Sequence, residues 1–177
     1  YEIKVQANSA TFKYDGNEKS VSGITVNGNA DGKFTIKVGD KSVEYTLSGL
    51  KAKAKGTDAG EYTAEVTGTV VVKDTAGNVV TDQFKVNTEN GKLTINPATM
   101  TMAVKGYDGV YDGKTHAAEI DVTEGATIQY KVAGTDEWTT IAPTIKDVGT
   151  KTVEVQATKP NYGTATATYT LNVTKRQ

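Results

Sequence analysis

The side chains that could carry covalent catalysis are few and scattered. His116 is the one histidine, cysteine is absent, and no serine or cysteine arrangement with His116 is recognisable. Nucleophilic catalysis needs a nucleophile beside a base, so the sequence predicts neither a Ser-His nor a Cys-His centre. Asp136 and Glu137 are adjacent carboxylates, but they lie in a turn-like segment where solvation is expected. We therefore predict that the chain is not an enzyme and uses no cofactor.

One segment has the spacing of a calcium-binding loop. Asn27-x-Asn29-x-Asp31-Gly32 places oxygen-bearing side chains at alternate positions, as hard cations require. The glutamate that should close such a loop is missing, because Val38 stands in its place. A hairpin turn rich in glycine and asparagine is the better interpretation, and we expect no metal site.

The candidate ligand-binding residues are the aromatic side chains Trp138, Tyr130 and Tyr162. Exposed aromatic rings commonly stack on sugars, and Trp138 shares its face with Thr140 rather than with Ile141. The competing interpretation is that Trp138 packs against a neighbouring strand, as large aromatic side chains often do. Both interpretations remain open at this stage.

Composition excludes several classes of partner. The chain has 177 residues, with 20 Lys and Arg against 21 Asp and Glu, and a formal net charge of -1. This balance gives no reason to expect nucleic acid or an anionic membrane as a partner. No apolar stretch approaches the length of a transmembrane helix, so we expect no membrane insertion. Without cysteine, stability must come from apolar burial and backbone pairing.

Apolar and polar residues alternate with period 2 along most of the chain, which predicts strands. The clearest run lies near the C-terminus, where threonines occupy one face and apolar residues the other. That apolar face comprises Ala165, Ala167, Tyr169, Leu171 and Val173. The alternation is typical of a sandwich with solvated outer faces. The Lys51–Lys55 segment alternates lysine with alanine and is expected to be an edge strand, and residues 70–80 read as a hairpin.

The same landmarks occur twice in the same order. Tyr14-Asp15-Gly16 and Asp58-Ala59-Gly60-Glu61-Tyr62 mark the first half, while Tyr111-Asp112-Gly113 and Asp147-Val148-Gly149-Thr150-Lys151 mark the second. Such repetition indicates a module used in series. We predict one module over residues 1–97, with inserted hairpins, and a shorter one over 98–177. The connection at Asn96-Pro97-Ala98 is short, so limited bending is expected.

Two sets of residues resemble known families. Asp58-x-Gly60-x-Tyr62 resembles the turn before the penultimate strand of immunoglobulin-like domains, in which the tyrosine hydroxyl bonds to nearby backbone. Lys151 replaces that tyrosine in the second half. Trp138-Thr139-Thr140, Thr152 to Tyr162 and Leu171 to Arg176 are similar to the bacterial immunoglobulin-like repeats of large surface proteins.

The resemblance implies two tandem immunoglobulin-like β-sandwich domains in a secreted, cell-wall-attached adhesin on the bacterial surface. The implied function is a structural or adhesive stalk segment, with neighbouring repeats as partners and a host glycan or mucin as a further candidate. The alternative is a carbohydrate- or mucin-binding accessory module of an extracellular enzyme. Some surface domains of this kind join a lysine to an asparagine in an isopeptide bond. Here Lys4 with Asn96, and Lys105 with Asn172, are expected instead to be solvated outer-face residues.

Overall fold

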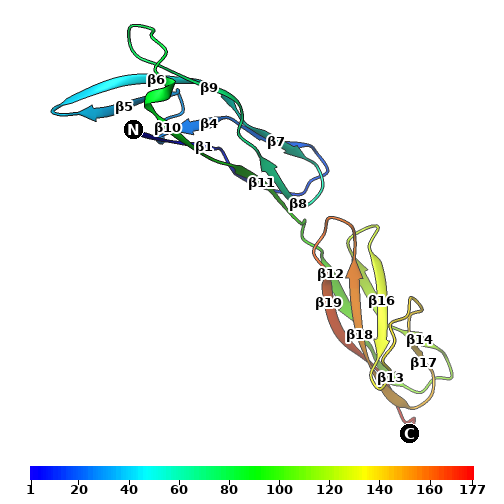
Figure 1. Ribbon diagram of the computed structural model, residues 1–177. Coiled ribbons are helices and arrows are strands. Elements are labelled where there is room, and N and C mark those ends of the chain that lie inside the picture. The colour runs from blue at the N-terminus through cyan, green and yellow to red at the C-terminus, as the bar shows by residue number, and fades with distance from the viewer. The chain divides into compact units, whose positions relative to one another are not determined.

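The computed structural model describes all 177 residues, which form two compact units, Tyr1–Asn96 and Pro97–Gln177. Strands make up almost all of the regular structure, and the single helical element is the short 3-10 turn η1 (Thr81–Gln83) (Figure 1). The predicted all-β class is therefore confirmed. The structure contains no helix that is long and apolar enough to span a membrane.

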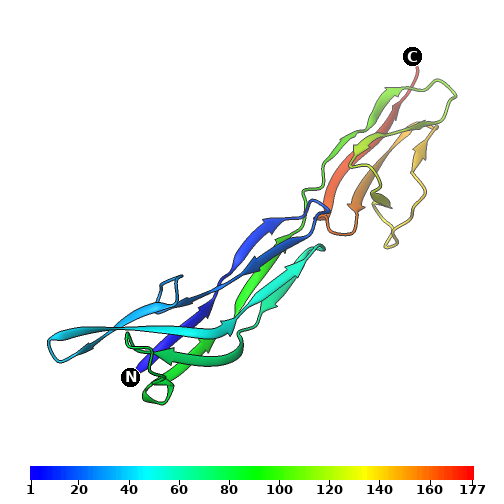
Figure 2. The same cartoon turned by 90° about the horizontal axis from the view of Figure 1, so that it is seen from above.

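The first two strands of unit 1, Tyr1–Asn96, run parallel to its last two strands. The strands of this unit are β1 (Glu2–Ala7), β2 (Ala10–Lys13), β3 (Lys19–Ser22), β4 (Ile24–Val26), β5 (Lys33–Val38), β6 (Lys41–Lys51), β7 (Lys53–Gly56), β8 (Gly60–Ala64), β9 (Thr67–Lys73), β10 (Lys85–Glu89) and β11 (Gly91–Asn96). β1 pairs in parallel with β10, and β2 pairs in parallel with β11 (Figure 2). The other sheet neighbours are β4 beside β1, β8 beside β11, β3 beside β7, and the hairpin β5–β6 beside β9.

The apolar interior of unit 1 is divided into two clusters. The first contains Ile3, Val5, Val26, Phe34, Leu47 and Val72. The second contains Ala7, Ala52, Ala54, Ala64, Leu93 and Ile95. Gly91 begins β11, between Val86, which packs against the first cluster, and Leu93 of the second, and a Cβ on it would lie 2.2 Å from the carbonyl oxygen of Asn8. Only glycine fits this close approach of two backbones.

Unit 2, Pro97–Gln177, is built around one four-stranded sheet. Its strands are β12 (Met102–Lys105), β13 (Tyr107–Val110), β14 (His116–Ala117), β15 (Glu119–Val122), β16 (Thr127–Val132), β17 (Thr144–Ile145), β18 (Gly149–Thr158) and β19 (Ala165–Thr174). The large sheet has the order β13-β19-β18-β16, and the pairs β12–β15 and β14–β17 complete the unit. β13 runs parallel to β19, while β18 is antiparallel to both β19 and β16.

The predicted alternation determines the core of unit 2. Tyr169, Leu171 and Val173 of β19 are buried, whereas Thr168 and Thr170, which alternate with them, are exposed. Val153 and Val155 of β18, Tyr130 of β16 and Ile145 of β17 complete the buried cluster. Each fully buried valine or leucine contributes roughly 1.5–3 kcal/mol relative to exposure, so this face holds the unit together.

The two units share one strand plan, which is that of an immunoglobulin-like sandwich. β2-β11-β8 of unit 1 corresponds to β13-β19-β18 of unit 2, and the pair β3–β7 corresponds to β14–β17. In both units the last strand is flanked by a parallel early strand and by an antiparallel strand, which is β8 in unit 1 and β18 in unit 2. This arrangement confirms the predicted tandem immunoglobulin-like fold.

The turn that leads into β8 also confirms the prediction of a tyrosine hydroxyl bonded to nearby backbone. The Tyr62 hydroxyl donates a hydrogen bond of 2.8 Å to the carbonyl oxygen of Asp58. The ring lies over Gly56, because a Cβ on that residue would lie 2.3 Å from Cζ of Tyr62. In unit 2, Lys151 Nζ donates to the carbonyl oxygen of Thr144 at 2.7 Å. The lysine therefore also bonds to backbone, but through a different carbonyl.

Two smaller expectations have different outcomes. Ala52 and Ala54 are buried while the intervening lysine is exposed, and β7 has the single sheet partner β3, so the predicted edge strand is confirmed. The hairpin predicted over residues 70–80 is reduced to one bridge between Lys73 and Val79. The Asp74 carboxylate accepts backbone N–H groups from the turn that follows it, which favours a compact loop over a longer ladder.

Candidate functional site

Trp138 lies at the open edge of the four-stranded sheet of unit 2. Tyr130 of β16 and Thr139 form an antiparallel bridge with two backbone hydrogen bonds of 2.8 Å. This pairing places Trp138 beside Lys131, whose Nζ lies 5.6 Å from the centroid of the indole. Trp138 is 39% exposed, so its ring is neither free of the protein nor buried in it.

The outer face of this sheet continues from Trp138 as a row of polar side chains. Lys131 is opposite Glu154, and Glu154 is opposite Thr168. Lys131 Nζ lies 3.6 Å from Glu154 Oε2. The next row consists of Gln129, Gln156 and Thr166. We call these residues, together with Trp138, the outer face.

The three aromatic residues singled out from the sequence do not form one site. Tyr130 is 8% exposed and belongs to the core, beneath the sheet rather than on it. Tyr162 follows β18 and is half-buried, with Lys159 Nζ 4.7 Å from its ring centroid. Only Trp138 combines large exposure with a place on the outer face.

His116 occupies a contact that the sequence did not reveal. Its ring stacks on Tyr107, with centroids 3.9 Å apart and planes at 6°. Its Nε2 lies 2.9 Å from Oδ1 and 3.0 Å from Oδ2 of Asp112. The hydrogen bond from His116, followed by one from the Lys114 N–H, holds the pKa of Asp112 below its usual value. The ring is held in position at the start of β14 and has no nucleophile beside it.

Unit 1 has the same device at the equivalent turn. Asp15 accepts a hydrogen bond of 2.7 Å from Lys19 Nζ, four residues later, and one of 2.9 Å from the Asn17 N–H. The bond from Lys19 is the main reason that the pKa of Asp15 is also lowered. The repeated Tyr-Asp-Gly landmark is therefore an Asp turn closed by a cationic or imidazole side chain.

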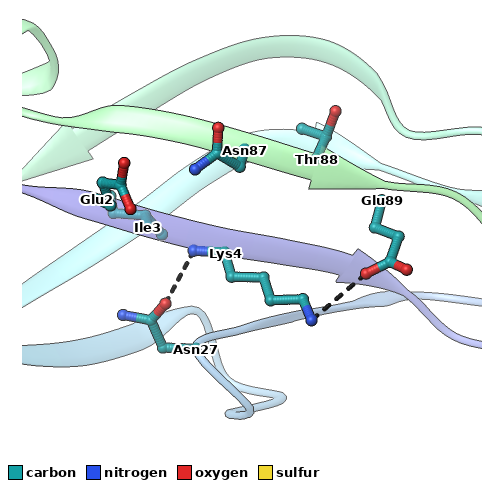
Figure 3. Close-up of a pocket in the computed structure, with 7 residues that line it drawn as sticks. All are labelled: Glu2, Ile3, Lys4, Asn27, Asn87, Thr88 and Glu89. Carbon is teal, nitrogen blue, oxygen red and sulfur yellow. Dashed lines mark hydrogen bonds and ion pairs between the residues drawn. The ribbon is translucent and has the colours of Figure 1, made fainter.

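A shallow groove of about 480 Å³ lies on the outer side of β1 and β10 in unit 1 (Figure 3). Asn27 Oδ1 accepts the Lys4 N–H at 2.9 Å, and Lys4 Nζ lies 3.4 Å from Glu89 Oε2 (Figure 3). The Lys4 and Glu89 side chains are 64% and 57% exposed, so water screens this pair. Lys4 is a solvated residue on the side of β1 that faces away from the core, as expected.

The other lysine–asparagine combination has a different surrounding. Asn172 Nδ2 donates to Asp108 Oδ1 at 2.9 Å, and Asn172 Oδ1 accepts from the Thr150 hydroxyl at 2.6 Å. These bonds tie β13, β19 and β18 together across one row. The amide is occupied by hydrogen bonds, which assigns it a structural role.

No group of three or more histidine, aspartate or glutamate side chains is arranged to hold a metal ion. The loop with calcium-like spacing is a turn: Asn27 and Gly28 have φ of 47° and 87°, and Val26 and Asn29 form a bridge. The Asp31 carboxylate accepts the Lys33 N–H, and the Asn29 amide donates to the Lys33 carbonyl. The Asn29 and Asp31 side chains thus bond within the turn, whereas the Asn27 side chain bonds to β1.

Comparison with known proteins gives matches to solved structures alone, because no protein-family model and no curated protein matches the chain. The I-band fragment I67-I69 from titin is 13% identical, with a TM-score of 0.34; the match covers 97% of this chain and 64% of the fragment. DIP-gamma IG1+IG2 is 10% identical, with a TM-score of 0.32, and the match covers 95% and 94% of the two chains.

The N-terminal Ig1-2 module of the Drosophila receptor protein tyrosine phosphatase DLAR is 14% identical, with a TM-score of 0.33, and both chains are covered completely, at 100%. The immunoglobulin-like assignment rests on the strand pairing of this chain and not on these likenesses.

Proposed function

We propose that the chain is a force-bearing spacer in a secreted, wall-attached surface protein of a bacterium, in series with neighbouring repeats. The observation that carries the proposal is the parallel pairing of early and last strands in both units. Tension applied at the two ends of a unit pulls such strands along one another, so several backbone hydrogen bonds must break together. Peeling an antiparallel edge would break them one at a time.

Each of the parallel ladders concerned joins four or five consecutive residue pairs. In unit 1, β1 pairs with β10 from Glu2 to Gln6, and β2 pairs with β11 from Ala10 to Lys13. In unit 2, β13 pairs with β19, and the Tyr111 N–H extends the ladder by donating to the Thr174 carbonyl at 2.9 Å. The Thr150–Asn172–Asp108 bonds add side-chain links across the same strands.

The connection between the units also supports a spacer. The Asn96 carbonyl accepts the Tyr14 N–H at 2.8 Å, and the Ala98 N–H donates to the Asn161 carbonyl at 2.9 Å. The Ala98 carbonyl in turn accepts the Gly163 N–H at 2.9 Å. Pro97 is thus the one residue between these anchored neighbours, and its ring fixes φ near −65°. A linker this short has few accessible conformations, so it reduces the end-to-end length of the two units very little.

A second proposed role is adhesive, with a host glycan or mucin as partner. The same binding would serve a carbohydrate- or mucin-binding accessory module of an extracellular enzyme, which is the alternative to a surface stalk. The exposure of Trp138 at the sheet edge favours this role. Tyr162, half-buried beneath Lys159, remains a weaker candidate for contact.

Single-molecule stretching of the chain from its two ends tests the spacer role. Tyr111→Pro removes a donor from the β13–β19 ladder and should lower the unfolding force of unit 2, because forced unfolding follows the unfolding barrier. Ala133→Pro is the matched control: it removes the 2.8 Å bond to the Thr152 carbonyl, outside that ladder. The control should lower equilibrium stability and leave the force nearly unchanged. Equal effects of the two prolines on force would contradict the proposal.

A further inference from the structure

We propose that the outer face of unit 2 binds a neutral, hydroxyl-rich glycan chain that lies across the sheet with one sugar on Trp138. This inference rests on the adhesive role proposed above, for which it names the ligand class and the binding surface, and it does not depend on the force-bearing role. It rests on four features of the outer face: an aromatic platform, paired charges, amide and hydroxyl groups, and a groove at the far edge.

The aromatic platform is the indole of Trp138. Trp138 is the one tryptophan of the chain and is 39% exposed at the edge of β16. An indole combines a flat apolar surface with an N–H donor, so it suits a ligand that is apolar on one side and polar on the other. A pyranose ring has this character, with C–H groups on its faces and hydroxyls at its rim.

The charges of the face cancel. Lys131 and Glu154 lie 3.6 Å apart and are the charged members of the outer face as defined above. A strongly anionic or cationic ligand would have to compete with this pair, whereas a neutral one would not. The pair also offers ammonium donors and carboxylate acceptors to hydroxyl groups.

The remaining side chains both donate and accept hydrogen bonds. Gln129 and Gln156 lie side by side, and Thr166 follows in the same row. Primary amides and hydroxyls match sugar hydroxyls in both directions. Since these side chains stand on paired strands, little backbone ordering is needed when a ligand binds.

A groove of about 470 Å³ extends the face at its far edge. It is lined by Thr168 and Thr170 of β19 and by Lys105, Gly106 and Asp108 opposite. Gly106 lies so close to β19 that a Cβ on it would lie 2.1 Å from the Thr170 carbonyl oxygen. Lys105 and Asp108 again contribute opposite charges. From Trp138 to Thr168 the row crosses three strand spacings, or about 14 Å, which requires an extended ligand.

The test is a titration of the full chain, observed by amide and indole NMR signals, with cellohexaose and mannohexaose and, for comparison, a hyaluronan hexasaccharide. We expect at least one neutral hexasaccharide to shift the Trp138 indole signal and the Gln129, Gln156 and Thr168 amides, with a Kd of about 1 mM or tighter. Trp138→Ala should weaken binding at least about tenfold, and Trp138→Phe should weaken it less. Tyr111→Ala is the matched control, because Tyr111 is similarly exposed, at 37%, but lies off this face.

A charge variant tests the neutrality argument independently of the tryptophan. Glu154→Gln leaves Lys131 without its carboxylate partner, so the affinity for hyaluronan should rise severalfold relative to the affinity for the neutral oligosaccharides. Shifts confined to other surfaces, binding unchanged by Trp138→Ala, or no shift with either neutral oligosaccharide at about 10 mM would overturn the proposal. A preference of the unmodified chain for hyaluronan would also overturn it.

Discussion

Gly49 and Gly68 face each other across the β6–β9 ladder so closely that a Cβ on Gly68 would lie 2.1 Å from the carbonyl oxygen of Gly49. Both have positive φ, at 90° and 111°. The register of the ladder shifts at this point, between Ser48 and Leu50. The glycine pair therefore marks the place where β6 passes from Leu47, in one core cluster of unit 1, to the segment preceding Ala52, in the other.

Replacing Gly49 by alanine should destabilise unit 1 by about 2–4 kcal/mol, because both the conformation and the space exclude a Cβ. Such a Cβ would lie 1.9 Å from the Thr69 carbonyl oxygen. Gly77→Ala is the control: φ is 87° there, but nothing lies within 4 Å of the added atom. It should cost only about 1 kcal/mol. Urea unfolding of both variants measures the difference, and equal losses would show that contact with Thr69 is unimportant.

Asp112 should contribute to stability above its unfolded pKa, near 3.8. Its folded pKa is lowered, so the unfolded state binds the proton first as the pH falls, and the contribution is lost as pH falls through the folded value. Asp112→Asn should therefore reduce the acid dependence of unit 2 stability between about pH 5 and pH 2. Thermal melts over that range measure it.

Two further variants make the Asp112 test specific. His116→Lys reproduces the Asp15–Lys19 pair of unit 1 and should preserve the acid dependence. Asp136→Asn, in the exposed loop after β16, should leave the profile unchanged. An Asp112→Asn profile that overlies the unmodified one would refute this role.

Alkaline pH should unfold unit 2 through Tyr169. Burial, and to a smaller degree the nearby Tyr130, raises the pKa of Tyr169 from 10.0 to about 12. The folded state therefore retains a proton that the unfolded state loses, so stability falls as pH rises from about 10 to 12. Tyr169→Phe should remove most of this decline. Absorbance of ionised tyrosine, followed together with circular dichroism, tests whether ionisation and unfolding coincide.

Each unit should fold when expressed alone. The interiors are separate, with two clusters in unit 1 and one in unit 2. Residues 1–97 and 98–177 should each give a cooperative thermal transition and a β-rich spectrum, with no change on adding calcium or a chelator. If neither piece folded, a core shared across Pro97 would be required.

Local patterns predicted most of the strands and part of the candidate site. Alternation identified the buried face of β19, and the Asp-x-Gly-x-Tyr spacing identified the Tyr62–Asp58 bond. The same alternation placed Tyr130 between Ile128 and Val132, so its burial was already implied and its candidacy as a ligand residue conflicted with the pattern.

Contacts between distant segments could not be predicted in this way. The stacking of His116 on Tyr107 depends on how β13 and β14 cross, and the outer-face row depends on the registers of β16, β18 and β19. Register is set by pairing across the sheet and not by any one strand. The Gly49–Gly68 contact is of the same kind, since neither glycine differs in sequence from an ordinary turn residue.

The parallel pairing of end strands also governs how such a module can be rearranged. Ala98 is bound near the start of β19, and the chain leaves unit 2 at the end of that strand, beyond Thr174. At roughly 3.3 Å per residue, the ten residues of β19 separate the two ends by about 33 Å. Many domains have neighbouring termini and accept circular permutation. A circular permutation of unit 2 would need a linker of about ten added residues to join its two ends. Cutting the chain at Pro97 and joining whole units in series, by contrast, leaves every ladder intact.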